Sequence, residues 1–233
     1  MLLSSYRLYV PFFIIFTLMT EFITYWKNLF IRPKVFFENH FSEGKNDARY
    51  FYFAMFIFGT GTGIDRLDRQ LTQHYLKGTL DQAGIINTWW GYWLIGIIAG
   101  IVGGCISYFV GGWFYNVRLK WCKADDDPET SKSLYLYSSF VLASVIVLIA
   151  LINTFLFEKP YMEDSVFTIW DACSLLITVF TIYYSIYVSF VGVTTSTNAN
   201  WTRAVIWFMV LPALIYSLLY FTVIGIIYAY FTR

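Results

Sequence analysis

The sequence predicts an all-α membrane protein, a bundle of five transmembrane helices preceded by an N-terminal interfacial helix. Composition is the first reason: of 233 residues, 58% are hydrophobic and only 13% are charged, whereas a soluble domain carries about 25% charged residues. Distribution is the second reason, because the apolar residues form several runs near the length of about 20 residues that crosses a hydrocarbon core. Aromatic residues make up 22% of the chain, and Trp and Tyr suit the headgroup boundary of a bilayer.

The N-terminal segment, residues 1–47, is expected to form a region of its own. Its apolar part, residues 6–25, suits a spanning helix poorly, because Pro11 lies near the start and Glu21 lies inside. We therefore expect a helix that lies in the membrane interface. Basic residues then alternate with phenylalanines, which suits an anionic membrane surface, and the residues expected to contact that surface are Lys27, Arg32 and Lys34.

Residues 48–233 are expected to form the five-span bundle, and the run at 89–112 is its most distinctive member. This run has no charged side chain, and small residues repeat along it at intervals of four. At helical pitch such rows form grooves in which a neighbouring helix can approach closely. The residues expected to serve helix packing or oligomer contacts form two rows, Gly96, Gly100 and Gly104, and Gly103, Ser107 and Gly111. A groove that lines a pore or joins two protomers is the alternative interpretation.

The other four spans are expected at about 48–64, 134–157, 167–193 and 203–231. The polar stretch 65–88 is predicted to be an amphipathic helix outside the membrane, in which Asp65 and Arg69 form an i,i+4 pair and Leu67, Leu71 and Tyr75 lie on one face. Residues 113–133 are predicted to be a loop. Pro212 is expected to kink the last span.

The basic residues predict the orientation of the bundle. With the N-terminus inside, inner segments hold 11 of the 16 Lys and Arg residues and outer segments hold 5. The excess of inner Lys and Arg favours a cytoplasmic N-terminus and an external C-terminus.

The sequence offers little catalytic or binding chemistry. We expect no catalytic residue, no cofactor, no metal site and no nucleic-acid partner, since common catalytic and phosphate-binding motifs are absent. The acidic run Asp125–Asp127 could bind a cation, but Asp127-Pro128-Glu129 is typical of a helix start. Asp171 falls in the first turn of its span, where it can face water. Three widely spaced cysteines, Cys105, Cys122 and Cys173, are expected to be small buried hydrophobes.

Several short motifs follow one another in a characteristic order along the chain. They are RPKVFF at 32–37, GGWFYNVR at 111–118, LYLYSS at 134–139, YVSFVGV at 187–193 and TRAVIWFMVLP at 202–212. With the five spans, this order resembles the Ypt-interacting-protein (Yip) family of five-span membrane proteins. The residues that carry the resemblance are Arg32, Pro33, Phe36, Phe37, Gly111, Gly112, Tyr135, Tyr137, Gly192, Arg203, Ala204 and Pro212.

The resemblance implies a cytosolic N-terminus and a non-enzymatic role. Eukaryotic relatives bind Rab-type GTPases and shape trafficking membranes, and they carry a long cytosolic N-terminal domain. This chain is more similar to the short bacterial branch, which implies a bacterial inner membrane, and the missing extension puts GTPase recruitment in doubt.

Three functional hypotheses follow. The leading one is a structural or interaction component of the membrane, whose partners are the lipid bilayer and a second copy or another membrane protein. The alternative is a homo-oligomeric channel or an effector subunit of a larger membrane system. A third is a membrane-embedded enzyme that acts on lipid through Asp171 or the carboxylates of Asp125–Asp127.

Overall fold

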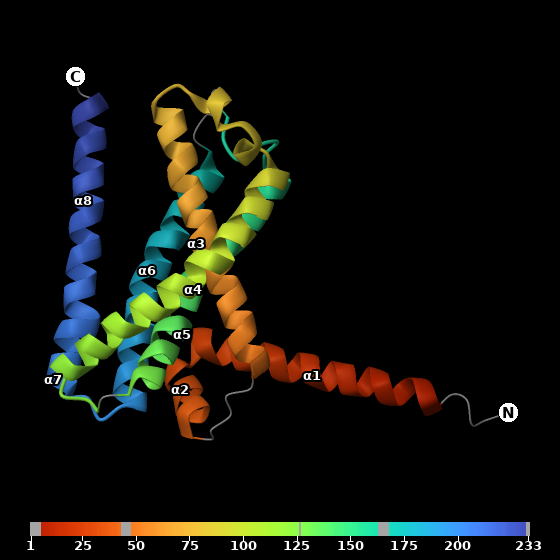
Figure 1. The fold of residues 1–233 in the computed structure, drawn as a ribbon, viewed down its shortest axis with the longest axis vertical. Coiled ribbons are helices and arrows are strands. Elements are labelled where there is room, and N and C mark those ends of the chain that lie inside the picture. The colour runs from red at the N-terminus through yellow and green to blue at the C-terminus, as the bar shows by residue number, and fades with distance from the viewer. Residues whose placement is uncertain (1–5, 43–47, 126, 163–167, 232–233) are drawn as a thin grey trace. The chain divides into compact units, whose positions relative to one another are not determined.

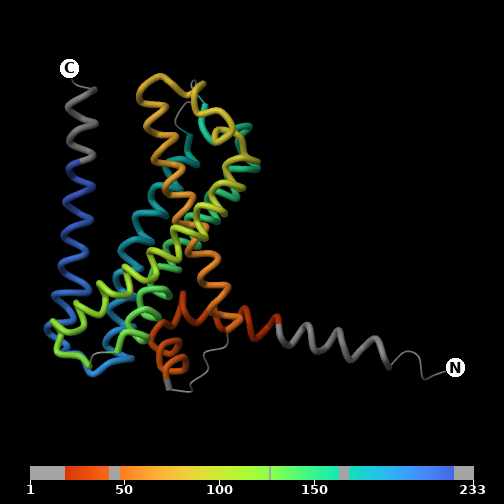
Figure 2. Tube along the Cα trace, viewed as in Figure 1, coloured from red at the N-terminus to blue at the C-terminus, as the bar shows by residue number. Residues whose placement is uncertain are grey.

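The structure, a computed structural model, describes residues 6–42, 48–125, 127–162 and 168–231 (Figures 1 and 2). Within these residues the regular structure is helical, with no β-strand. The chain divides into two compact units, Met1–Lys45 and Asn46–Arg233.

The first unit consists of helix α1 (Tyr6–Ile31) and helix α2 (Pro33–Ser42). Proline occupies the first position of α2, as expected, because that position needs no N–H donor. The two helices are tied by a hydrogen bond of 3.0 Å between the Tyr25 hydroxyl and His40 Nδ1, and the ring of Phe36 stacks on that of His40. Helix α1 runs beyond the predicted end at residue 25, and its interfacial placement stays a prediction.

The second unit contains the remaining elements, which are α3 (Ala48–Leu76), the 3₁₀-helical segment η1 (Leu80–Asn87), α4 (Trp89–Trp121), α5 (Pro128–Leu156), α6 (Ile169–Ser196), α7 (Trp201–Ala204), the π-helical segment η2 (Val205–Val210) and α8 (Leu211–Phe231). Residue 167, the predicted start of the fourth span, lies outside the described residues.

The amphipathic helix predicted at 65–88 is present only as far as Leu76, as a continuation of α3, and residues 80–87 form the 3₁₀ segment η1 instead. Helix α3 continues without a break to Leu76, because Leu67 and Leu71 extend its buried face into a cluster with Leu80 of η1 and Tyr92 of α4. The expected i,i+4 pair is present, with Arg69 Nη2 2.6 Å from Asp65 Oδ2.

The predicted loop at 113–133 is also mostly helical. Helix α4 extends to Trp121 because Tyr115, Asn116 and Leu119 are buried against neighbouring elements. Its 33 residues correspond to a length of about 50 Å. Helix α5 begins at Pro128, and the Asp127 side chain caps it by accepting from the N–H groups of Glu129 and Thr130. The predicted helix start at Asp127-Pro128-Glu129 is confirmed.

Hydrogen bonds between connections define the two ends of the second unit. At one end, Asn200 N–H donates to the Cys122 carbonyl (2.8 Å) and Asn198 Nδ2 donates to Asp125 Oδ2 (2.7 Å). At the other end, Asn87 Nδ2 donates to the carbonyl of Tyr161 (3.1 Å). Asn87 comes just before the first residue of α4 and Cys122 just after the last, so the two sets of hydrogen bonds lie at opposite ends of that helix.

Helices α3 and α4 cross each other (Figure 1), and glycines of both helices lie at the crossing. A Cβ atom on Gly59 would lie 2.7 Å from the Gly100 carbonyl oxygen, and a Cβ on Gly104 would lie 2.6 Å from the Gly59 Cα. A Cβ on Gly63 would overlap the backbone of Gly96. The first predicted glycine row therefore faces the backbone of α3 in the same chain.

The second predicted row does not share one neighbour. A Cβ on Gly103 would meet no atom within 4 Å, whereas one on Gly111 would overlap the ring of Tyr135 on α5. Ser107 is half-buried. On this side of α4 the large residues Ile106, Phe109 and Val110 are exposed, and so is Cys105.

Substituting one glycine from each row tests this packing. Gly100→Leu places a side chain against the Gly59 backbone, so we expect loss of the monodisperse species in detergent or a melting temperature lower by about 10 °C or more. Gly103→Leu is the matched control, because it adds the same side chain to open space, and we expect a change within about 2 °C. Equal behaviour of the two variants would contradict the packing role.

Candidate functional site

The candidate site is a cavity of about 580 Å³ inside the second unit. Residues of α3, α4, α5, α6, η2 and α8 line it. Its polar lining comes mainly from tyrosine and serine hydroxyls, from the Asp65–Arg69 pair and from Arg118, whereas Leu142, Ile182 and Phe208 form part of its apolar wall. A pocket of this size and character is typical of a small-molecule or lipid site.

Tyr115 is the central polar residue of the cavity. Its buried hydroxyl lies 3.0 Å from Ser138 Oγ on α5 and 2.8 Å from Ser189 Oγ on α6. Its ring makes edge-on contacts with Tyr135 and Phe208, each at a centroid distance of 5.3 Å. One side chain thus joins four elements, α4, α5, α6 and η2.

Arg118 is buried three residues before the end of α4, with 9% of its surface exposed. It donates a hydrogen bond to the carbonyl oxygen of Trp207, and its guanidinium carbon lies 4.0 Å from the centroid of the Phe208 ring. Within the described part of the chain, no carboxylate lies at ion-pair distance from it. Among the described residues, Arg118 is therefore a buried cation of the cavity lining that no carboxylate pairs with.

The local backbone explains why the Trp207 carbonyl accepts this bond. In η2 the N–H of Leu211 bonds to the carbonyl of Ile206, five residues back. The same register would pair residue 212 with Trp207, but Pro212 has no N–H to donate. The π-helical segment η2 therefore ends just before Pro212, where the sequence predicts a kink, and Arg118 satisfies the carbonyl that the proline leaves open.

A second polar network lies at the η1 end of the unit. Tyr92 Oη donates to Asp68 Oδ1 (2.8 Å), and the hydroxyls of Thr72 and Tyr161 are 2.8 Å apart. Asn87 holds the Tyr161 backbone at both its N–H (2.9 Å) and its carbonyl (3.1 Å). These bonds connect α3, the start of α4 and the connection that follows α5.

Asp68 is the titratable group of this network, and it lies in the polar part of α3 beyond the predicted span. Burial raises the pKa of its carboxyl to about 6, the hydrogen bond from Tyr92 opposes this rise, and the charge of Asp65 adds to it. In the first unit, burial lowers the pKa of His40 to about 4.

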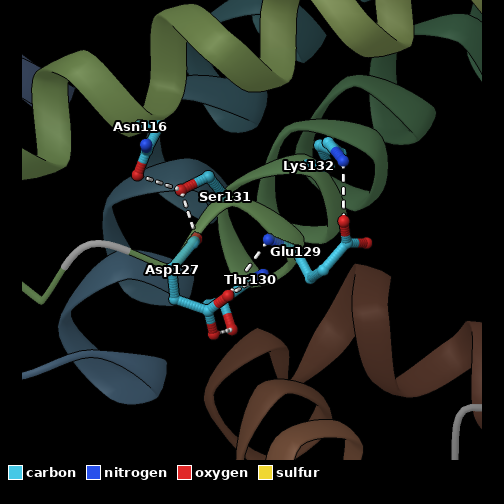
Figure 3. A network of polar contacts seen from close by, with 6 residues as sticks. All are labelled: Asn116, Asp127, Glu129, Thr130, Ser131 and Lys132. Atoms are coloured by element: carbon cyan, nitrogen blue, oxygen red, sulfur yellow. Dashed lines mark hydrogen bonds and ion pairs between the residues drawn. The ribbon is translucent and has the colours of Figure 1, made fainter.

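The acidic residues considered in the sequence have local structural roles. Figure 3 shows Asp127 at the start of α5, where it caps the helix. In the same figure Ser131 Oγ, in the first turn of α5, donates to Asn116 Oδ1 of α4 (3.0 Å). Asp171 forms a capping box with Thr168 at the start of α6. No group of three or more potential metal ligands occurs among the residues that the structure describes, and Asp126 lies outside them.

The residues that carry the family resemblance lie in different places. Tyr135 lines the cavity, whereas Tyr137 and Gly192 are buried elsewhere in α5 and α6. A Cβ on Gly112 would lie 2.9 Å from the Lys132 Cα. Pro212 lines the cavity, and the exposed Arg203 bonds to the Trp121 carbonyl (3.1 Å).

The corresponding residues of the first unit divide into two groups. Pro33, Phe36 and Phe37 are buried. The basic residues predicted to contact the membrane surface are all exposed, and they are Lys27, Arg32 and Lys34. Lys34 lies 3.8 Å from Glu38 of the same helix.

Tyr115, Arg118 and Asp68 are not among the site residues that the sequence predicts. Arg118 carried a usable signal, because an ionisable residue close to a long apolar run marks a candidate site. It was assigned to a loop because the apolar run was expected to end at Gly112. The cysteine prediction was wrong for Cys105 and Cys173, which are exposed, while Cys122 is buried.

Four of the described helical segments are long and apolar enough to cross a membrane, and they are Trp89–Trp121, Pro128–Leu156, Ile169–Ser196 and Trp201–Thr222. These long apolar helices, with large apolar side chains exposed along them, define a polytopic α-helical membrane protein. The family model described as Yip1 domain matches residues 27–224. The chain therefore belongs to the Yip family, as the motif order predicts. Neither the comparison with curated proteins nor that with solved structures finds a match.

Asp68 predicts a specific pH dependence of stability. Because the folded-state pKa of about 6 exceeds the ordinary value, the folded protein binds the proton more strongly, and stability falls as the pH rises from about 4 to about 6. From pH 5 to pH 7 this loss is about 1 kcal/mol, or about 2–4 °C in melting temperature.

The measurement compares the wild type with Asp68→Asn, which keeps an acceptor for Tyr92. The difference between their melting temperatures in detergent should shift in favour of Asp68→Asn as the pH rises from 5 to 7. His40 titrates with the opposite sign, and its contribution cancels in this difference. A difference that does not change with pH would contradict the assignment.

Proposed function

We propose that this Yip family protein is a non-enzymatic, five-span structural or interaction component of the membrane. In this proposal it resides in a bacterial inner membrane, with a cytoplasmic N-terminus and an external C-terminus. The excess of Lys and Arg in the predicted inner segments supports this orientation.

The two faces of α4 carry the proposal. One face packs through its glycines on the backbone of α3. The other exposes a row of large apolar side chains, and its members are Ile98, Ile101, Val102, Ile106, Phe109 and Val110. Such a surface suits contact with lipid or with another membrane protein, whereas the glycine row is already covered by α3.

The proposed fifth span is the first part of α3, residues 48–64. It supplies Gly59 and Gly63 to the crossing with α4, and Ile64 is fully buried. A helix packed so closely along a spanning helix is well placed to enter the bilayer with it. In the first unit, α1 is proposed to lie in the membrane interface. The side chains proposed to contact anionic lipid are Lys27, Arg32 and Lys34, and each basic residue would contribute about 1 kcal/mol to the free energy of membrane binding.

Cysteine labelling tests the proposed threading. In a background where Cys105, Cys122 and Cys173 are replaced by serine, single cysteines are introduced at the exposed positions Ala48, Asp81 and Glu129. A membrane-impermeant maleimide added to intact cells should label Asp81→Cys. It should label Ala48→Cys and Glu129→Cys only after permeabilisation.

Each position has its own consequence. If Ala48→Cys and Asp81→Cys label from the same side, α3 does not span. If Glu129→Cys and Asp81→Cys label from the same side, the threading of α4 is wrong.

Photo-crosslinking in cells tests the interaction role. A photoreactive residue at Ile106, which is 60% exposed, should form adducts that contain a second protein chain. Val188, which is fully buried, is the control and should form none. Adducts at Ile106 that contain only lipid would contradict an interaction role for this face.

A further inference from the structure

The charge of Arg118 is the first observation that points to a ligand. An arginine has five N–H donors, and the one hydrogen-bond acceptor found for Arg118 among the described residues is the Trp207 carbonyl oxygen. The rings of Phe208 and Tyr115 lie 4.0 Å and 5.2 Å from the guanidinium carbon. The ring of Phe114 lies at 5.9 Å. A neutral carbonyl and three rings leave the positive charge without a counter-ion, so an anion would be stabilised here.

The lining of the cavity changes in polarity near Arg118. Tyr115, Ser138 and Ser189 form a connected group of hydroxyls beside it. Leu142, Ile146 and Ile182 belong to the apolar wall. The other charged groups in the lining, Asp65 and Arg69, already neutralise each other at 2.6 Å. This combination fits an amphiphile with one anionic group.

The size of the cavity limits what can occupy it. A transmembrane helix of 20 residues has a volume of about 2,400 Å³, several times the 580 Å³ available. A helix from a second copy therefore does not fit. Cavities of roughly 300–1,000 Å³ take drug-sized molecules, which is the size of a phosphate group with part of one acyl chain, so the rest of a bound phospholipid would lie outside the cavity.

Arg118 also lies at a suitable depth. It is three residues from the end of α4. Just after that end, the Cys122 carbonyl accepts a hydrogen bond from the Asn200 N–H, which lies in the turn that connects α6 to α7. Helix ends of spanning segments lie near the headgroups. An anion on Arg118 would thus be at headgroup level, with the apolar wall extending into the bilayer.

We propose that this cavity binds one anionic phospholipid, with its phosphate on Arg118 and the hydroxyls around Tyr115, and one acyl chain along the wall formed by Leu142, Ile146 and Ile182. This site is independent of the interaction role proposed above, because it uses the interior of the bundle and not the exposed face of α4.

Native mass spectrometry of the detergent-solubilised full chain tests the proposal with two probes, dioleoyl phosphatidylglycerol and dioleoyl phosphatidylcholine. The wild type should retain one phosphatidylglycerol per chain at concentrations where phosphatidylcholine is lost. Arg118→Gln should weaken retention of phosphatidylglycerol by about tenfold or more. Arg203→Gln is the matched control, since Arg203 is exposed at the same end of the unit and lies outside the cavity lining.

Ser185→Phe is a second variant, which keeps the test decisive if Arg118→Gln does not fold. Ser185 lines the cavity, and its hydroxyl donates to the Ile182 carbonyl of its own helix, with no bond to another helix among the residues that the structure describes. The added ring should fill the apolar part and reduce phosphatidylglycerol retention with Arg118 intact.

Four outcomes would overturn the proposal. The first is equal retention of phosphatidylglycerol and phosphatidylcholine by the wild type. The second is unchanged retention of phosphatidylglycerol by a folded Arg118→Gln or Ser185→Phe protein. The other two are stabilisation of the protein by inorganic phosphate equal to that by phosphatidylglycerol, and a mass spectrum that shows a dimer of the chain with no lipid bound.

Discussion

The backbone contact between α3 and α4 is the interaction on which the rest of the second unit depends. In a bilayer, apolar helices gain little from avoiding water, so association relies on close packing and on interhelical hydrogen bonds. The glycines at 59, 63, 96, 100 and 104 bring the two backbones together. This contact also determines the rotation of α4, which turns Tyr115 and Arg118 toward the interior and the row at Ile98–Val110 outward.

Hydrogen bonds between side chains complete the bundle around this contact. The indole N–H of Trp93 donates to Thr154 on α5 (2.9 Å), and the Tyr183 hydroxyl lies 2.8 Å from Ser217 on α8. With the bonds of Tyr115, they connect each long helix from α4 to α8 to a neighbour. Because such groups are costly to leave unpaired in an apolar environment, they select one rotation and depth for each helix.

Local signals predicted helix starts well and helix ends poorly. The start of α5 was predictable because Asp127, Pro128 and Glu129 satisfy the first N–H groups without help from the rest of the fold. The ends of α3 and α4 were not, because hydropathy changes at Ile64 and Gly112 while both helices continue. Their continuation depends on burial of Leu71 and Leu119 against residues that are distant in sequence.

The sequence by itself determined the medium and the family of this protein, since composition, apolar runs and motif order are properties of the linear chain. It also indicated that α4 packs through small residues. Only the tertiary structure decided that Gly104 contacts α3 while Gly103 meets open space. The same holds for the pairing of Arg118 with the carbonyl that Pro212 leaves unsatisfied. The physical reason is that helix rotation and the filling of a cavity depend on contacts between segments about 90 residues apart, such as Arg118 and Trp207.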